Sequence, residues 1–123
     1  MSKKTIAAPA AARRQRAPME RRAWIRYPCD LESFCQPMQT RNAKVVCSVR
    51  VCDISNNGIS LLAGTEFAVG SFLSVEMIRV SQELSQPVLA RVVHTTPQAD
   101  GDWLLGCELT SKLSNNELRD LLT

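Results

Sequence analysis

The stretch KVVCSVRVCD, residues 44–53, decides how this chain folds. Its apolar and polar side chains alternate along the segment. One face carries Val45, Cys47, Val49 and Val51, and the other carries Lys44, Ser48 and Arg50. A period of two residues is that of a β-strand with one buried face. The segment is therefore predicted to be a strand of a sheet that covers an apolar core.

Similar strand signals recur from residue 27 onward, with turn residues between them. Further strands are predicted over 27–38, 59–63, 72–80, 88–95 and 103–109. Six short strands with regular turn signals predict a mainly all-β protein, a six-stranded antiparallel β-barrel, because closure removes exposed strand edges.

The ends of two of these elements carry specific local signals. Residues 98–101 contain an Asp-Gly pair, which is typical of a β-hairpin turn. Ser114, with Glu117 three residues later, forms a capping box before an apolar run. We therefore expect one short C-terminal α-helix, which would cover an open end of the barrel.

Charge divides the 123 residues into two parts. Residues 1–26 hold eight basic residues and one acidic residue, whereas residues 27–123 hold seven basic and eleven acidic residues. The net charge of +3 is thus +7 in the first part and −4 in the second. We expect residues 1–19 to be a disordered basic arm and residues 20–123 to be the β-barrel domain. A basic arm on an acidic body indicates an anionic partner.

Two motifs point to the chemistry of that partner. Arg22 and Arg26 are four residues apart just before the first strand, and the turn Asp53-Ile54-Ser55-Asn56-Asn57-Gly58 follows strand 44–53. A guanidinium group fits phosphate oxygens and the O6/N7 edge of guanine. A carboxylate such as Asp53 accepts from the N1 and N2 donors of that base. Together these groups suit a small ligand that contains both guanine and phosphate.

The combination RxxxR…DxSxxG resembles the signature of PilZ domains, the bacterial receptors for cyclic di-GMP. The resemblance covers residues 20–122 and implies a six-stranded antiparallel barrel with a C-terminal helix. Gly70, Ala90-Arg91-Val92-Val93 and Gly106-Cys107-Glu108-Leu109 also resemble the family. His94 stands where many relatives have an aromatic residue and Leu109 where Phe is frequent, and both are expected to be packing positions.

The resemblance also implies which residues bind cyclic di-GMP. The implied set is Arg21, Arg22, Arg26, Asp53, Ser55, Asn57 and Gly58. Arg22 and Arg26 would wrap the ligand, and Asp53 would accept from guanine. Ser55 would donate to a phosphate or base oxygen, and Gly58 would supply a positive φ and a close backbone approach.

Two residues beside these motifs have roles that stay open. Arg21 implies a second, stacked ligand molecule, because another guanidinium can neutralise the added phosphates, or it is one more solvated charge. Trp24 either stacks on a base or packs on the barrel.

Other classes of site have little support in the sequence. The five cysteines form no CxxC pair, and His94 has no cysteine at zinc spacing, so neither a metal nor a cofactor is expected. The sequence contains no matched set of acid, base and nucleophile that would indicate an enzyme. The chain has no apolar run long enough to span a membrane, and buried, reduced cysteines favour a cytoplasmic protein.

The function expected from these observations is a cyclic di-GMP receptor whose arginine loop becomes ordered on binding and is read by an unidentified downstream protein. Two alternatives remain. A small β-barrel could bind nucleic acid through the basic arm, although aromatic residues form only 5% of the chain and single-strand binders use stacking platforms. A PilZ-like adaptor could instead bind protein alone, although such adaptors typically lack both motifs.

Overall fold

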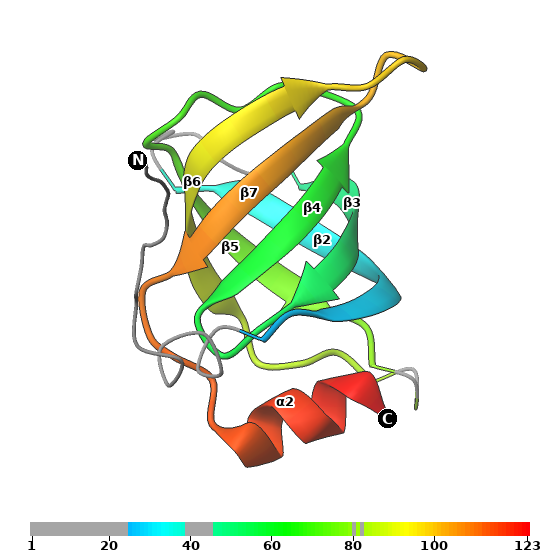
Figure 1. Ribbon diagram of the computed structural model, residues 1–123, viewed down its shortest axis with the longest axis vertical. Coiled ribbons are helices and arrows are strands. Elements are labelled where there is room, and N and C mark those ends of the chain that lie inside the picture. The colour runs from blue at the N-terminus through cyan, green and yellow to red at the C-terminus, as the bar shows by residue number, and fades with distance from the viewer. Residues whose placement is uncertain (1–24, 39–45, 80, 82) are drawn as a thin grey trace, which may run out of the picture.

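The computed structural model describes residues 25–38, 46–79, 81 and 83–123 of the chain (Figure 1). The expected arm, residues 1–19, lies outside the described residues. The described elements are β2 (Tyr27–Pro37), β3 (Cys47–Ile54), β4 (Gly58–Ala63), β5 (Phe72–Met77), β6 (Val88–Pro97), β7 (Trp103–Leu109) and α2 (Asn115–Leu122). The strands form a closed barrel in the order β2-β3-β4-β7-β6-β5, and every neighbouring pair is antiparallel. The predicted six-stranded antiparallel barrel with a short C-terminal helix is thereby confirmed.

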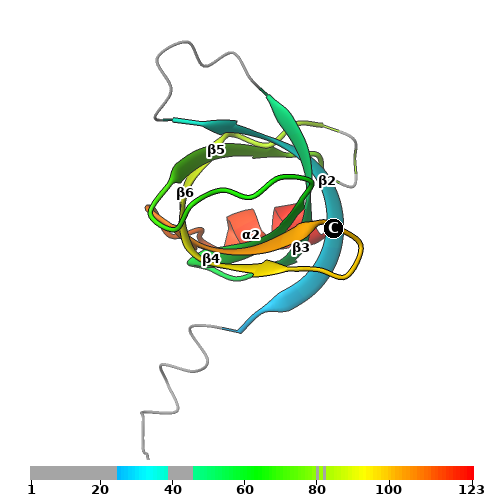
Figure 2. The ribbon, with the colours of Figure 1, turned by 90° about the horizontal axis from the view of Figure 1, so that it is seen from above.

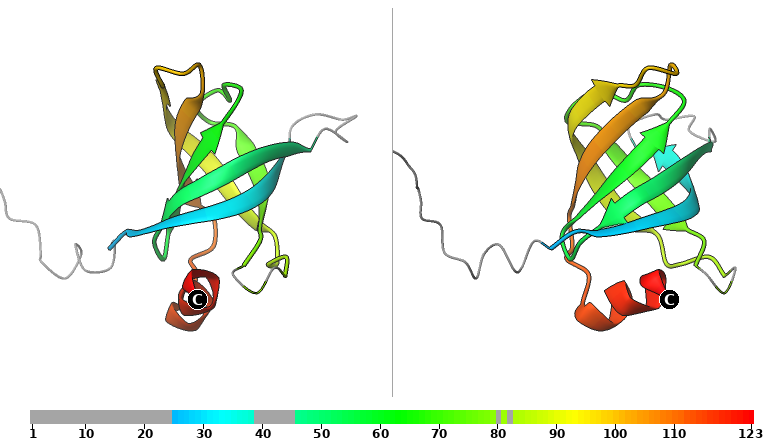
Figure 3. Two further views of the ribbon diagram at one scale, coloured as in Figure 1. Left: turned by 90° about the vertical axis from the view of Figure 1, so that its right-hand side faces the viewer. Right: turned by 45° about the vertical axis from the view of Figure 1, so that its right-hand side comes forward.

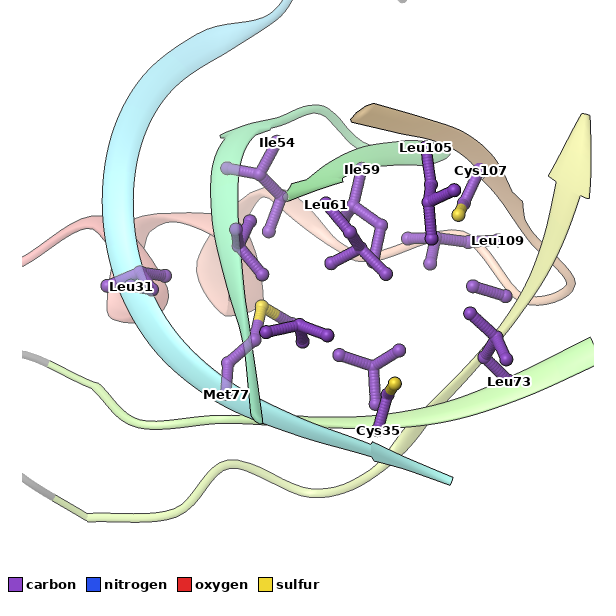
Figure 4. Close-up of a cluster of buried hydrophobic side chains, with 14 of the residues drawn as sticks. Leu31, Cys35, Ile54, Ile59, Leu61, Leu73, Met77, Leu105, Cys107 and Leu109 are labelled. Carbon is purple, nitrogen blue, oxygen red and sulfur yellow. The ribbon is translucent and has the colours of Figure 1, made fainter. Parts of the chain in front are cut away.

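The barrel interior is the core of the protein, and alternation along the strands fills it. Val49 and Val51 of β3 are buried, and so are Leu73, Val75 and Met77 of β5. In Figure 4 the labelled side chains of several strands converge on this interior. Burying one such aliphatic side chain stabilises the fold by about 1.5–3 kcal/mol. The core therefore fixes which side chains remain on the outer face.

One end of the barrel is covered by α2, as Figure 2 shows in a view down the ring of strands. The helix begins with the expected capping box: Glu117 N donates to Ser114 Oγ at 3.0 Å, and Ser114 N donates to Glu117 Oε1 at 2.8 Å. Leu118 and Leu121 are buried against the core. In the part of the chain that the structure describes, no helix is long and apolar enough to cross a membrane.

The predicted strand limits needed small corrections. The strand expected over 72–80 ends at Met77, and the one expected over 88–95 continues to Pro97. The predicted turn at 98–101 is present, and Gly101 has a φ of +92°. Gly70, at the end of the loop before β5, has a φ of +96°. Both glycines therefore adopt a conformation that other residues rarely adopt.

Candidate functional site

The turn between β3 and β4 and the start of β2 meet at the barrel end that α2 covers (Figure 3). Ile54 and Ile59 flank this turn and are fully buried, so they anchor it to the core. Ser55 N donates to the carbonyl oxygen of Gly58 over 2.9 Å. The sequence motif DxSxxG thus forms a tight connection whose ends are fixed by the barrel.

Ser55 and Asn57 turn inward within this connection. Ser55 is 1% exposed, and its hydroxyl lies 3.2 Å from Asn57 Oδ1 and 3.3 Å from the Gly58 carbonyl oxygen. Asn57 is 6% exposed, and its main-chain carbonyl oxygen accepts from Leu109 N over 2.8 Å. In this structure both side chains hold the shape of the turn.

Asp53 faces the outer surface and forms the centre of a polar cluster. Arg26 Nη1 donates to Asp53 Oδ1 over 2.5 Å, and Ser60 Oγ donates to the same oxygen over 3.0 Å. The Arg26 side chain is 47% exposed and that of Asp53 is 30% exposed. An ion pair at such exposure adds little stability, about 0–1 kcal/mol. Replacing this ion pair by contacts with a ligand would therefore cost the protein little stability.

A β-bulge explains why Asp53 points outward. The register pairs Val51 with Leu61 and Asp53 with Ser60, so Cys52 is one extra residue in β3. Regular alternation from Val51 would have turned Asp53 into the core. Bulges re-aim side chains in this way and are frequent beside binding sites.

Position 58 holds a glycine because little room is left for a side chain, and not because of its backbone conformation. The positive φ expected for it is wrong, because Gly70 and Gly101 are the glycines with positive φ among the described residues. Gly58 instead begins β4 in an extended strand. A Cβ atom there would lie 3.0 Å from the carbonyl oxygen of Cys107 and 3.3 Å from Arg26 Nη2. Crowding by Cys107 and Arg26 of the same chain is thus the reason for the glycine, and the close approach expected between this backbone and a ligand stays a prediction.

The sequence-predicted residues are only partly brought together by the described structure. Arg26 and Asp53 share one outer patch, Gly58 lies buried beside Arg26, and Ser55 and Asn57 lie in the same turn. Arg21, Arg22 and Trp24 lie outside the described residues. Sequence reasoning missed Ser60, which orients Asp53. Ser60 is the only polar residue of the segment 59–63, directly after the motif, and this was the signal that could have found it.

A second ion pair lies on the adjoining part of the outer surface. Gly58 is paired with Glu108 in the β4–β7 register, and Glu108 Oε1 lies 2.9 Å from Arg91 Nη2. The outer surface therefore carries two arginine–carboxylate pairs, with Asp53 on β3, Glu108 on β7 and strand β4 between them. Such pairs offer donors for phosphate or guanine edges and acceptors for guanine N1 and N2.

The thiols near this patch are held in their neutral form. Burial, with a smaller contribution from the charge of Asp53, raises the pKa of Cys29 to about 11. Burial likewise raises the pKa of Cys52. Among the described residues, no group of three or more His, Cys, Asp or Glu side chains is arranged to hold a metal ion.

Comparison with known proteins gives a family and a fold. The sequence profile described as the PilZ domain matches residues 20–123. Comparison with curated proteins gives no match.

Two solved structures resemble the fold of the chain. One is the inhibitor of motility MotI/DgrA of Bacillus subtilis, with 19% identity and a TM-score of 0.59 over 90% of this chain. The chain spans about half of that protein, 49% of its length. The other is the PilZ domain of YcgR from Escherichia coli with c-di-GMP, with 18% identity and a TM-score of 0.55, covering 82% of this chain and 86% of that one.

Proposed function

Because this chain belongs to the PilZ domain family, we propose that it is a receptor for cyclic di-GMP that couples the level of this messenger to a partner protein. The Arg26–Asp53 ion pair beside Gly58 carries the proposal. It combines a guanidinium group and a carboxylate on one outer patch, above the buried backbone of Gly58. The PilZ domain of YcgR, whose fold this chain shares, was solved with c-di-GMP.

Recognition of guanine rests on Asp53. Its carboxylate accepts from guanine N1 and N2, while the Ser60 hydroxyl holds it in orientation at 3.0 Å. Arg26 leaves part of its contact with Asp53 and turns its fork toward guanine O6 and N7 or toward a phosphate. Its partial exposure supports this, since the side chain has room to move.

The residues before β2 complete the site in this proposal. Arg22 contributes the second fork of RxxxR, and Arg21 neutralises a second stacked ligand molecule. Ser55 and Asn57 act by holding the turn, and Gly58 lets the ligand approach the backbone. Ordering of the arginine segment on the barrel creates the surface that an unidentified downstream protein reads. The receptor itself is not an enzyme and needs no cofactor or metal.

Titration calorimetry with cyclic di-GMP tests the proposal. We expect saturable binding in the micromolar range or tighter, about −8 kcal/mol or better. Asp53→Ala weakens binding and reduces discrimination against cyclic di-AMP, because the carboxylate reads the guanine edge. Asp30→Ala is the matched control, since Asp30 also pairs with an arginine, Arg50, over 2.7 Å on the same strand pair.

The outcome separates the candidate functions. A folded protein without any heat of binding would contradict the receptor and favour an adaptor that binds protein alone. Binding of single-stranded nucleic acid in preference to cyclic di-GMP would favour the nucleic-acid alternative.

A further inference from the structure

Two cysteines face each other across β2 and β3 on the inner side of the barrel. The register pairs Cys35 of β2 directly with Cys47 of β3. Cys35 is 1% exposed, and Cys47 is half-buried and packs against the same core. Figure 4 shows Cys35 among the side chains of the interior. The two thiols therefore lie on one face of one strand pair.

The placement of this pair suits a disulfide. Directly opposed residues of an antiparallel pair have Cα atoms about 4.5–5.5 Å apart, and a disulfide joins Cα atoms about 4.4–6.8 Å apart. Burial raises the pKa of Cys35 to about 12, and the charge of Cys47 and a hydrogen bond between the two side chains add to this shift. The two side chains thus interact already while both thiols are free. A bridge between them does not require the strands to separate.

The other three cysteines, all of which the structure describes, are placed differently. Cys29 and Cys52 lie where the registers of their strands shift. Cys29 Sγ donates to the carbonyl oxygen of Val51 over 3.6 Å, and Cys52 Sγ donates to that of Arg50 over 3.8 Å. Cys107 has no cysteine opposite it in its registers with β4 and β6. Cys35 and Cys47 are therefore the one pair of cysteines that is opposed in register.

The position of the pair in the barrel gives its two thiols different access to solvent. β2 ends at Pro37 and β3 begins at Cys47, so the pair lies at the end of this ladder. The helix α2 covers the other end of the barrel (Figure 3). Val46, the residue before Cys47, is 57% exposed. A small oxidant can therefore reach Cys47 from this end, whereas Cys35 is sheltered behind it.

We propose that Cys35 and Cys47 form an oxidation site, at which hydrogen peroxide produces an intrachain disulfide between β2 and β3. The Cys47 sulfur, after losing its proton, attacks one peroxide oxygen; the O–O bond breaks, a sulfenic acid forms, and the hydroxide released takes up the proton as water. The Cys35 thiol then displaces the hydroxyl group, the S–S bond forms, and a second water leaves. The two thiols lose two electrons and two protons, which reduce the peroxide to two waters.

The disulfide would close the connection between β2 and β3. Such a loop restricts the unfolded chain, so the oxidised protein should be the more stable form. We expect its Tm to rise by roughly 10 °C. The competing role is that of two small apolar core residues, in which the thiols would stay free on exposure to peroxide. The inference does not depend on cyclic di-GMP binding, because it needs only the register and the two thiols.

Peroxide treatment of the full-length wild-type protein, followed by peptide mapping, tests the site. The number of thiols that react with iodoacetamide after denaturation should fall from five to three and return to five with a reductant. Cleavage after Lys, Arg and Glu puts each cysteine in a different peptide, and the expected bridge joins residues 33–41 to residues 45–50. A bridge between other peptides, a bridge between two chains, or five thiols that remain free would overturn the inference.

Two variants provide the comparison. Cys47→Ser should lose neither of the two thiols as a pair nor gain in Tm when peroxide is added. Cys52→Ser is the matched control, because Cys52 is also half-buried on β3 but has no cysteine opposite it. It should form the bridge and show the same rise in Tm as the wild type. Loss of two thiols in Cys47→Ser, or of none in Cys52→Ser, would assign the oxidation to other cysteines.

Discussion

Asn56 and Leu113 are joined by two hydrogen bonds in opposite directions. Leu113 N donates to the carbonyl oxygen of Asn56 over 2.6 Å, and Asn56 Nδ2 donates to the carbonyl oxygen of Leu113 over 2.9 Å. Asn56 Nδ2 also lies 3.0 Å from Asn115 Oδ1, at the first residue of α2. The turn that contains the candidate site is thereby connected directly to the start of the helix.

Asn56→Ala should loosen this connection and destabilise the protein by about 1–3 kcal/mol, because the side-chain bonds to the helix start are lost. Urea denaturation measures the change, and hydrogen exchange of the α2 amides should rise with it. Asn116→Ala is the control, since Asn116 is exposed on the same helix and contacts only Arg119 among the contacts found for its side chain in the described structure. Equal stability of both variants would show that the turn and helix are held by the core alone.

Gly58→Ala should impair both folding and binding, because the new methyl group meets the backbone oxygen of Cys107 at 3.0 Å. We expect a loss of about 1–3 kcal/mol in stability from overpacking and weaker cyclic di-GMP binding. Gly64→Ala is the matched control, since a Cβ atom there has nothing within 4 Å. Thermal unfolding and calorimetry check the pair, and unchanged binding by a folded Gly58→Ala protein would remove Gly58 from the site.

Arg26→Ala should cost about 1–3 kcal/mol of cyclic di-GMP binding, which is the range for a bidentate guanine contact. The fold should hardly change, because the Arg26–Asp53 pair is half-exposed. Arg22→Ala should cost a similar amount. Arg50→Ala is the control, because Arg50 forms a comparable exposed pair with Asp30. Wild-type affinity in either motif variant would refute the role assigned to that arginine.

Stoichiometry tests the role of Arg21. Three guanidinium groups within six residues, those of Arg21, Arg22 and Arg26, exceed the charge of one ligand with two phosphates. We therefore expect two stacked cyclic di-GMP molecules per chain by calorimetry, and a shift toward one in Arg21→Leu. A ratio of one that the substitution leaves unaltered would make Arg21 a solvated charge.

The buried thiols predict a loss of stability at alkaline pH. Burial raises the pKa of both Cys35 and Cys107 to about 12, from the usual value of 9.0. Between pH 9 and pH 12 the unfolded chain therefore loses thiol protons that the folded chain keeps. The free energy of unfolding falls with pH in that window and is unaffected by these thiols below it, with a slope of at most about 1.4 kcal/mol per pH unit for each thiol.

Urea denaturation between pH 8 and pH 10.5 measures this decline, and the variant Cys107→Ala provides the comparison. Its slope against pH should be shallower than that of the wild type, because one raised thiol has been removed. Identical slopes would show that Cys107 does not contribute to the decline. Alkylation of Cys35 by iodoacetamide at pH 8 should also be slow, since the thiolate is the reacting form.

Local patterns were sufficient to predict the barrel and its helix. Val49 and Val51 alternate with polar residues, and Ser114 with Glu117 marks the helix start, so each element carries its own signal. These signals are local, and the closed barrel follows because the alternating faces must be buried together. The strand limits differed by a few residues, since ladder pairing and not composition ends a strand.

The candidate site was predictable only in its residue types. The motifs identified Arg26 and Asp53, which the structure brings into contact. The bulges at Cys52 and Val93 depend on pairing with other strands, so no local sequence pattern predicts them. The positive φ expected for Gly58 was wrong for the same reason: the constraint there comes from Cys107, 49 positions along the chain.

Barrel closure also limits how a partner can recognise this protein. Each of the six described strands pairs with a neighbour on both sides over part of its length, so none has an edge that is free from end to end. This limits the addition of a strand to the sheet, which is the way many domains capture extended peptides. Side chains on the barrel wall, the loops and α2 are the surfaces that a partner can recognise instead. Substitutions on those surfaces can then change partner choice without altering the backbone that holds the site.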